Sequence, residues 1–114
     1  MKLKILKSKI HRATVTEACL DYEGSISIDA YLMKEAGIIN YEKVHILNVT
    51  TGSRLETYAI PSDKKGAICI NGAAAHLVSP GHLVIIVAYV QIEYEEAIDY
   101  QPTIILLNEK NEIK

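Results

Sequence analysis

The chain has 114 residues, a formal net charge of −2 at pH 7, and a composition that is 49% hydrophobic and 23% charged. These values exclude a disordered tail and fit one globular domain, with no room for a second of ordinary size. A nucleic-acid-binding surface is not expected, because the charge is slightly negative and Trp and Phe are absent. A domain this small has a limited core, so we expect it to form an oligomer.

Two cysteines, Cys19 and Cys69, are too few for the disulfide framework of a small secreted domain. The histidines show no ligand spacing with them, and no metal site is expected. Lys recurs through residues 2–9, unlike a signal peptide, and the longest apolar run, 83–90, is too short to span a bilayer. The sequence therefore predicts a reduced, cytoplasmic protein with free thiols and no membrane contact.

The first half of the chain alternates polar and apolar residues in a way that is typical of strands. Strands are predicted over 2–10, 13–20, 26–28, 43–50 and 54–60, with turn residues at 21–25 and 51–52. One helix is predicted over 29–36. Asp29 can cap its amino end, and Gly37 can end it in a left-handed conformation.

The second half of the chain adds further short elements. A polar loop is expected over 61–66, strands over 67–70, 82–92 and 103–107, and helical turns over 73–76 and 93–99. The strand over 82–92 is predicted to be central because both of its faces are apolar. Residues 108–114 are polar and are expected to fray. Many short strands with brief helices predict a compact β-barrel or an α+β domain, and the pattern leaves the topology open.

The segment Tyr22-Glu23-Gly24-Ser25 is the first candidate for chemistry. A surface turn is the ordinary interpretation of a Gly-Ser dipeptide, and spacing alone favours it. The alternative is self-cleavage, because glycine lacks a Cβ and leaves its carbonyl carbon open to the hydroxyl of the next residue. An N-to-O acyl shift, elimination and hydrolysis would leave a ketone at the new amino terminus.

The strand over 54–60 offers a second candidate. Arg54, Glu56 and Tyr58 point to one face, so that Arg54 could hold a carboxylate and Tyr58 could donate a proton. A solvated edge with a half-buried Tyr58 is the alternative. Thr57 points to the other face, and a bend or bulge is needed to bring it into the same pocket.

Two further segments have both an ordinary and a functional interpretation. Asn71-Gly72-Ala73-Ala74-Ala75 fits a hairpin turn before a weak helix, or a backbone that approaches an anionic ligand closely. Lys9 and His11 share one face of the first strand, where surface charge explains them as well as a binding site does.

In this order, these segments resemble the pyruvoyl-dependent aspartate 1-decarboxylases. The matching stretches are Lys9–Arg12, Tyr22–Ser25, Asn48–Thr50, Arg54 with Thr57–Ile60, and Asn71–His76. The similarity runs from Met1 to about Glu112. One matching tetrapeptide would support the resemblance only weakly. Several matching segments, in register in a chain of this length, are specific for the family.

The resemblance implies a mainly β fold, a double-psi β-barrel with short helices, assembled as a homotetramer with active sites between neighbouring subunits. It implies that the single domain 1–114 cleaves itself into fragments 1–24 and 25–114, with or without a maturation factor. Ser25 would become a covalent pyruvoyl group, the cofactor that forms a Schiff base with L-aspartate and accepts the electrons released with CO₂. The product would be β-alanine for pantothenate and coenzyme A biosynthesis.

The resemblance also assigns roles to individual residues. Gly24 and Ser25 flank the cleaved bond, and Ser25 and Tyr58 are the catalytic residues, with Tyr58 as the proton donor. The substrate-binding positions are Lys9, Arg54, Thr57, Gly72, Ala73 and Ala74. The supporting positions are His11, Tyr22 and Asn71. His11 could instead make a structural hydrogen bond, and Asn71 with Thr57 is expected to polarise the Gly24 carbonyl.

Two alternatives stay open. A small β-barrel with the basic stretch 2–12 could be a dimeric nucleic-acid-binding module, which predicts an uncleaved chain and salt-dependent binding. The other keeps the enzyme but changes the substrate to another acidic amino acid, such as glutamate, because the length of the pocket depends on the folded structure.

Overall fold

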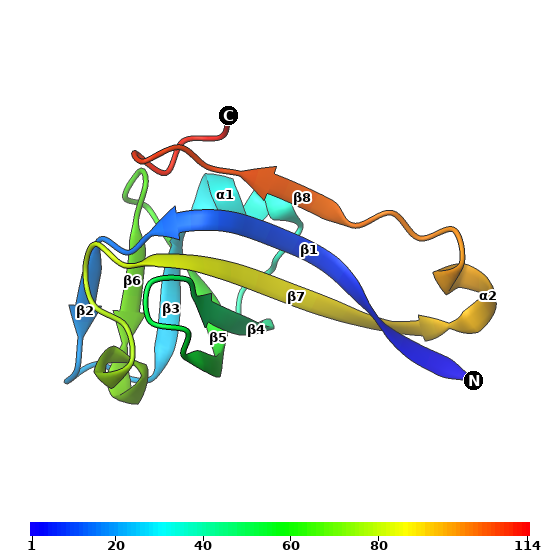
Figure 1. Cartoon of the computed structure of the whole chain (residues 1–114), viewed down its shortest axis with the longest axis horizontal. Coiled ribbons are helices and arrows are strands. Elements are labelled where there is room, and N and C mark those ends of the chain that lie inside the picture. The colour runs from blue at the N-terminus through cyan, green and yellow to red at the C-terminus, as the bar shows by residue number, and fades with distance from the viewer.

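The computed structural model describes residues 1–114 and is mainly β (Figure 1). Its strands are β1 (Lys2–Thr14), β2 (Glu17–Cys19), β3 (Ser25–Asp29), β4 (Lys43–Asn48), β5 (Arg54–Ser62), β6 (Ile68–Asn71), β7 (Leu83–Glu93) and β8 (Thr103–Leu106). The helical segments are α1 (Ala30–Ala36), the 3-10 helix η1 (Gly72–His76) and α2 (Tyr94–Ala97). None of the helices is long and apolar enough to cross a membrane. The predicted mainly β, barrel-like fold with short helices is confirmed.

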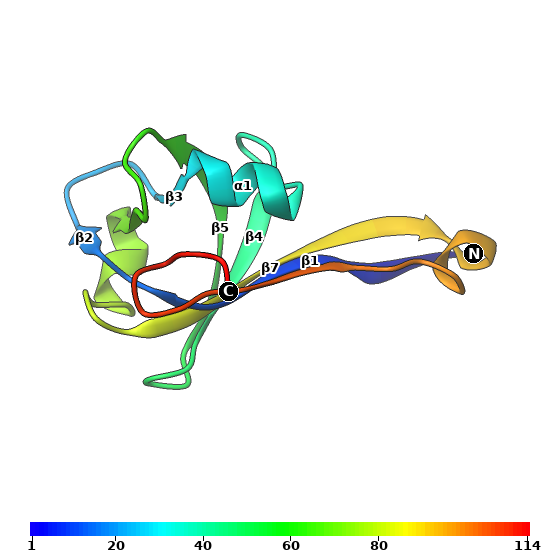
Figure 2. The ribbon, with the colours of Figure 1, turned by 90° about the horizontal axis from the view of Figure 1, so that it is seen from above.

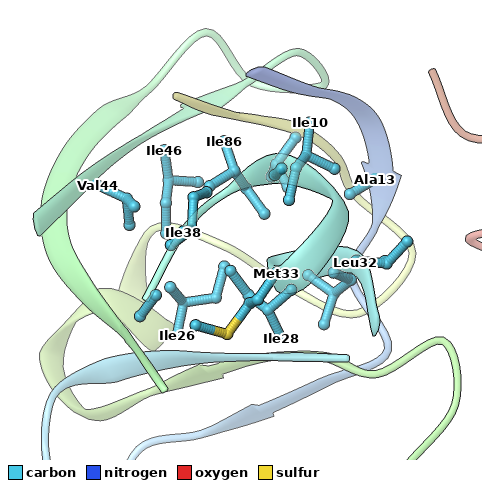
Figure 3. Packing of buried hydrophobic residues seen from close by; sticks show 14 of the residues in the cluster. Ile10, Ala13, Ile26, Ile28, Leu32, Met33, Ile38, Val44, Ile46 and Ile86 are labelled. Atoms are coloured by element: carbon cyan, nitrogen blue, oxygen red, sulfur yellow. The ribbon is translucent and has the colours of Figure 1, made fainter. Parts of the chain in front are cut away.

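All strands belong to one sheet in the order β2-β6-β3-β5-β4-β7-β1-β8. β5 joins its two halves, because residues 54–58 pair antiparallel with β4 and residues 59–62 pair parallel with β3. The chain after β1 links distant parts of the sheet. Val15 N–H donates to the His82 carbonyl, and Thr16 N–H donates to the Ile68 carbonyl. The sheet therefore wraps around its apolar face (Figure 3).

The interior of the barrel is filled mainly by β-branched side chains. The most deeply buried include Ile10, Ile26, Ile28, Ile46, Ile68, Ile70 and Ile86. Such side chains have few rotamers and pack well on a pleated surface, and burying one contributes about 1.5–3 kcal/mol. α1 adds Leu32 and Met33 to the same cluster (Figure 3).

The ends of α1 are set by the residues that the sequence predicts. Asp29 Oδ1 accepts the Tyr31 N–H at 2.9 Å, and Gly37 ends the helix at φ 73. The second carboxylate oxygen of Asp29 accepts the Gly66 N–H at 2.8 Å. The helix cap therefore also fixes the loop that leads into β6.

The long strands β1 and β7 run antiparallel beyond the barrel as an arm, with the amino terminus and α2 at its tip (Figures 1 and 2). β8 returns beside β1 in parallel. β7 lies between β4 and β1, so its predicted central position is confirmed. Several large apolar side chains on β7, α2, β8 and the connection between α2 and β8 are exposed, namely Tyr89, Tyr94, Ile98 and Ile104.

Most element boundaries shift by one to four residues from the prediction, and two of the differences have a clear cause. The strand predicted over 13–20 is broken, because Val15 and Thr16 leave the ladder to bond His82 and Ile68. The loop predicted over 61–66 begins after Ser62, because pairing with β3 carries β5 through that residue.

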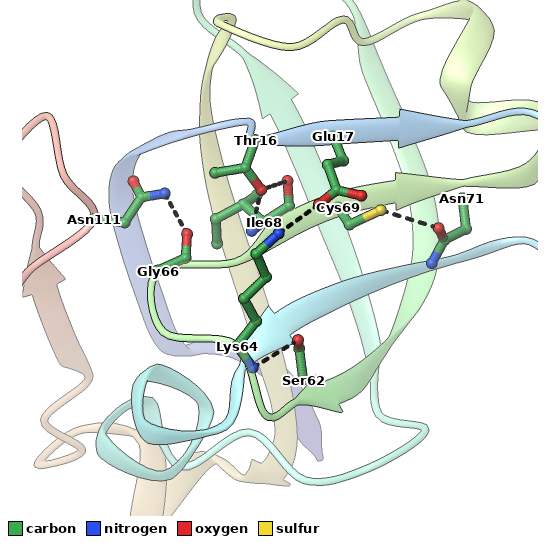
Figure 4. A network of polar contacts seen from close by, with 9 residues as sticks. All are labelled: Thr16, Glu17, Ser62, Lys64, Gly66, Ile68, Cys69, Asn71 and Asn111. Atoms are coloured by element: carbon green, nitrogen blue, oxygen red, sulfur yellow. Dashed lines mark hydrogen bonds and ion pairs between the residues drawn. The ribbon is translucent and has the colours of Figure 1, made fainter.

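The prediction that residues 108–114 fray is wrong. Asn111 is buried, with 4% of its surface exposed. Its Oδ1 accepts the Thr14 N–H at 2.7 Å, and its Nδ2 donates to the carbonyls of Thr14 and Gly66 at 2.8 Å each (Figure 4 shows the contact with Gly66). Asn111 also adopts φ 59, a left-handed conformation that asparagine tolerates better than most residues. One side chain therefore anchors the carboxyl-terminal segment to the barrel.

Replacing Asn111 should destabilise the fold. Asn111→Ala removes the partner of one partly buried N–H and of two carbonyls, so we expect the free energy of unfolding to fall by about 2–3 kcal/mol. The measurement is urea unfolding at a fixed protein concentration. Lys110→Ala, which removes an exposed neighbouring side chain, is the control. Equal stability of the two variants would contradict the anchoring role.

Candidate active site

Ser25 lies where three strands meet. It is the first residue of β3, it pairs with Asn71 of β6, and its neighbour Ile26 pairs with Ala59 of β5. Only 2% of its surface is exposed. A buried serine at the start of a strand needs a specific hydrogen-bond partner, since an unpaired hydroxyl there would cost about 1–3 kcal/mol.

Asn71 supplies that partner. Its Nδ2 donates to Ser25 Oγ at 3.0 Å and to Ser27 Oγ at 3.0 Å. Its Oδ1 accepts from Cys69 Sγ at 3.2 Å, a contact drawn in Figure 4. Ser25 Oγ in turn donates a long bond, 3.4 Å, to the Glu23 carbonyl. Both amide N–H groups of Asn71 therefore face serine hydroxyls, and the Gly24 carbonyl is not among its partners.

The turn before Ser25 packs directly on Gly72. Gly72 has φ 75, and a Cβ built on it would lie 2.7 Å from Gly24 Cα and 2.8 Å from Gly24 N. No side chain fits in that space. A Cβ on Gly24 would instead meet nothing within 4 Å. The close backbone approach expected at the Asn71-Gly72 segment is thus made to the chain's own turn, and it is Gly72 that permits it.

A small hollow opens over Ser25. This Ser25 pocket has a volume of about 190 Å³ and is lined by Tyr22, Glu23, Ser25, Tyr41, Tyr58 and Ile60. The rings of Tyr41 and Tyr58 lie 6.0 Å apart between centroids. The structure therefore places two of the predicted residues, Tyr22 and Tyr58, beside the serine.

Thr57 lies on the other face of β5. The pairing of β5 with β4 runs from Arg54 to Tyr58 in continuous register, so the bulge that the sequence argument required is not present. Leu55 packs against the core and Ala59 is buried within it, and alternation gives Thr57 the same inward direction. Thr57 does not line the Ser25 pocket.

Lys9 and Arg54 also lie away from the Ser25 pocket of their own chain. Arg54 is four residues before Tyr58 on an extended strand, which separates their Cα atoms by about 13 Å. Lys9 is on β1, paired with Val87 and Ile104. One chain therefore does not bring the two predicted carboxylate-binding cations to Ser25.

His11 carries an unsatisfied nitrogen. Its Nδ1 is buried without a hydrogen-bond partner, so this atom does not make the structural bond that the sequence left open. Burial, and after it the positive charges of Lys9, Arg12 and Lys114, lowers the pKa of His11 below its usual 6.5. The imidazole is therefore neutral at pH 7.

The small residues after Asn71 form the 3-10 helix η1 and not a hairpin turn. Gly72 is buried against the turn, Ala73 is exposed, and Ala74 packs on the core. Neither alanine lines the Ser25 pocket.

Comparison with known proteins decides the family. All 114 residues match the family described as aspartate decarboxylase. An aspartate 1-decarboxylase of Clostridium beijerinckii is 55% identical, over 100% of this chain and 93% of its own length. Those of Campylobacter fetus subsp. fetus and Corynebacterium efficiens are 51% and 57% identical, over 99% and 96% of this chain and 98% and 81% of theirs. The chain belongs to the aspartate decarboxylase family. The resemblance read from its sequence is thereby confirmed.

In this member of the aspartate decarboxylase family, three residues near Ser25 were not predicted from the sequence, namely Ser27, Tyr41 and Cys69. Strand alternation could have found Cys69, because it stands two residues before Asn71 and must share its face. Tyr41 gives no such signal. It sits in a connection at φ 71, and only the folded chain brings it to Tyr58.

The depressed pKa of His11 has a measurable consequence. The free imidazole protonates near 6.5 while the folded one resists, so the folded state loses stability as pH falls from 6.5 toward the lower folded value. Proton NMR should give a His11 midpoint below 6.5. Lys9→Gln should raise that midpoint, because it removes the positive charge that lowers the His11 pKa most. A midpoint at or above 6.5 in the unmodified protein would contradict this account.

Proposed function

We propose that this protein is an aspartate 1-decarboxylase, a lyase that converts L-aspartate into β-alanine and CO₂ and so supplies β-alanine for pantothenate biosynthesis. Its cofactor is a pyruvoyl group made from Ser25. Family membership supports the reaction. The observation that carries the cofactor assignment is the buried Ser25 hydroxyl, held by Asn71 directly after Gly24.

The cofactor forms by self-cleavage of the chain. Ser25 Oγ attacks the Gly24 carbonyl carbon, and its proton passes to the nitrogen of the Gly24–Ser25 bond, which departs as an amine and leaves an ester. Loss of the Ser25 Cα proton then expels the Gly24 carboxylate and leaves dehydroalanine at position 25. One water enters and one ammonia leaves, which gives a ketone at the head of fragment 25–114 and a free carboxyl group on fragment 1–24.

The surroundings of Ser25 fit this group. Ser25 begins β3 and pairs with β6, so the new terminus stays held in the sheet after the bond is cut. A pyruvoyl ketone at position 25 would supply a carbonyl for the substrate amine and an electron sink for the pair released with CO₂. Tyr58 lines the same pocket and is the proton donor to the α-carbon, since its phenol presents an O–H group there.

A neighbouring subunit completes the site in a homotetramer. Arg54 and Lys9, the proposed partners of the substrate carboxylates, lie outside the Ser25 pocket of their own chain. The pocket is rimmed by Tyr22 and Tyr41, which are 67% and 71% exposed in the single chain. Exposed aromatic side chains of this kind commonly mark a subunit interface.

A cytoplasmic location is supported by the free cysteines Cys19 and Cys69, which the reducing cytosol preserves. Thr57, Ala73 and Ala74 are proposed to contact substrate through the family resemblance alone. The nucleic-acid-binding alternative gains no support from the family.

Mass measurement of the denatured protein tests the cofactor directly. We expect fragments 1–24 and 25–114, with the larger one lighter than its serine form by one ammonia. Ser25→Ala should remain a single inactive chain, because it has no nucleophile. An unmodified chain that stays uncut after long warm incubation, with or without cell extract as a source of a maturation factor, would contradict the proposal.

Gly72→Ala should slow cleavage strongly. The added Cβ would strike Gly24 Cα at 2.7 Å, so the turn that carries the cleaved bond must move. Gly52→Ala is the matched control, because Gly52 has φ 83 but open space around it. Both variants therefore share the backbone strain of about 1–2 kcal/mol, and only one has the collision. Equal cleavage rates in the two variants, followed by mass, would show that the contact with Gly24 does not matter.

A further inference from the structure

Asn71 occupies an unusual place for its side chain. It is the N-cap residue of η1, a position where asparagine normally caps the helix by accepting a backbone N–H. Here it makes no such bond. Its amide turns instead toward Cys69, Ser25 and Ser27. The direction of the Asn71 side chain is therefore set by these three contacts and not by helix capping.

The register of the sheet places these four side chains together. Ser25 is opposite Asn71 and Ser27 is opposite Cys69 in the antiparallel pair β3–β6. The residues between them, Ile26 and Ile70, are buried in the core. Alternation therefore directs the four polar side chains to the outer face, around one amide.

The amide of Asn71 could be rotated by 180°, which exchanges its oxygen and its NH₂ group. Its partners differ in which of these two ends they can bond. Serine hydroxyls both donate and accept, so Ser25 and Ser27 could bond either end of the amide. A thiol has one hydrogen to donate and a sulfur that accepts only weakly. The Cys69 thiol therefore favours the amide oxygen, and the Nδ2 group is left facing the serines.

The surroundings of Cys69 keep its hydrogen in place. Burial raises the pKa of the Cys69 thiol above its usual 9.0, and the negative charge of Glu17 and the nearby Cys19 add to this, against a smaller opposing effect of Lys64. Cys69 is thus a protonated donor at neutral pH. For the same reason it is a poor nucleophile and a poor metal ligand.

We propose that Cys69 is a positioning residue for self-cleavage, whose thiol fixes the Asn71 amide so that an N–H, and not the carbonyl oxygen, faces the Ser25 hydroxyl. This rests on the proposed cleavage at Gly24–Ser25. With an N–H donated to it, Ser25 Oγ does not give its own hydrogen to Asn71. That hydrogen stays available for transfer to the departing nitrogen, while the oxygen attacks Gly24.

The experiment is a time course of self-cleavage. Full-length chains are made by cell-free translation, quenched in denaturant at intervals, and assayed for fragment 25–114 by mass. Cys69→Ala and Cys69→Val remove the donor, and we expect cleavage about threefold to tenfold slower. Cys69→Ser keeps a hydroxyl donor in place of the thiol and should cleave within about twofold of the unmodified rate.

Cys19→Ala is the matched control, because Cys19 stands opposite Asn71 on β2 and makes no hydrogen bond to it. It should cleave at the unmodified rate. Thermal unfolding midpoints that agree between the alanine and serine variants at position 69 separate the orientation of Asn71 from a loss of packing.

Two results would overturn the role of Cys69. One is unmodified cleavage in Cys69→Ala while Asn71→Ala is slow. The other is a Cys69→Ser variant as slow as Cys69→Ala. An unmodified chain that never cleaves is a different result, because it refutes the proposed cleavage itself and the role of Cys69 with it.

Discussion

The backbone contact between Gly72 and Gly24 is the constraint on which the site depends. A left-handed glycine ends β6 and turns the chain into η1, and this brings the Gly24 backbone to a distance that excludes any side chain on Gly72. The turn that precedes β3 is thereby laid over the end of β6. Ser25 and Asn71 become buried beneath it, although both stand on the outer face of the sheet.

A second constraint comes from the change of partner in β5. Up to Tyr58 the strand pairs with β4, and from Ala59 it pairs with β3, which begins at Ser25. Tyr58 is therefore carried to the level of Ser25, while alternation directs Thr57 and the buried Ala59 to the other face of β5. The pocket that results lies on the outside of the barrel. Arg54, at the start of β5, and Lys9, on β1, do not line it.

The sequence predicted those features that local chemistry controls. Asp29 and Gly37 bound α1 as capping rules require, and the apolar pattern of β7 identified a central strand. Prediction from the sequence was wrong where a residue far along the chain determines the local structure. Asn111 looks like part of a frayed polar end until Thr14 and Gly66 are brought beside it. The family resemblance named Asn71 and Ser25, and alternation puts Cys69 on their face, but only the folded chain shows that the Cys69 thiol donates to the Asn71 amide.

The polar cluster of Ser25, Ser27, Cys69 and Asn71 follows from the need of buried polar groups for hydrogen-bond partners. A nucleophilic hydroxyl buried in a sheet needs a donor, and an amide that can point either way needs something to orient it. Each buried polar partner needs a hydrogen-bond partner of its own. The chain of partners stops at Cys69, because the next charged pair along the same face, Glu17 with Lys64 at 3.0 Å, is exposed and can be satisfied by water (Figure 4). The burial of one serine hydroxyl thus constrains the residues of the neighbouring strand β6, including Cys69, which does not bond the serine itself.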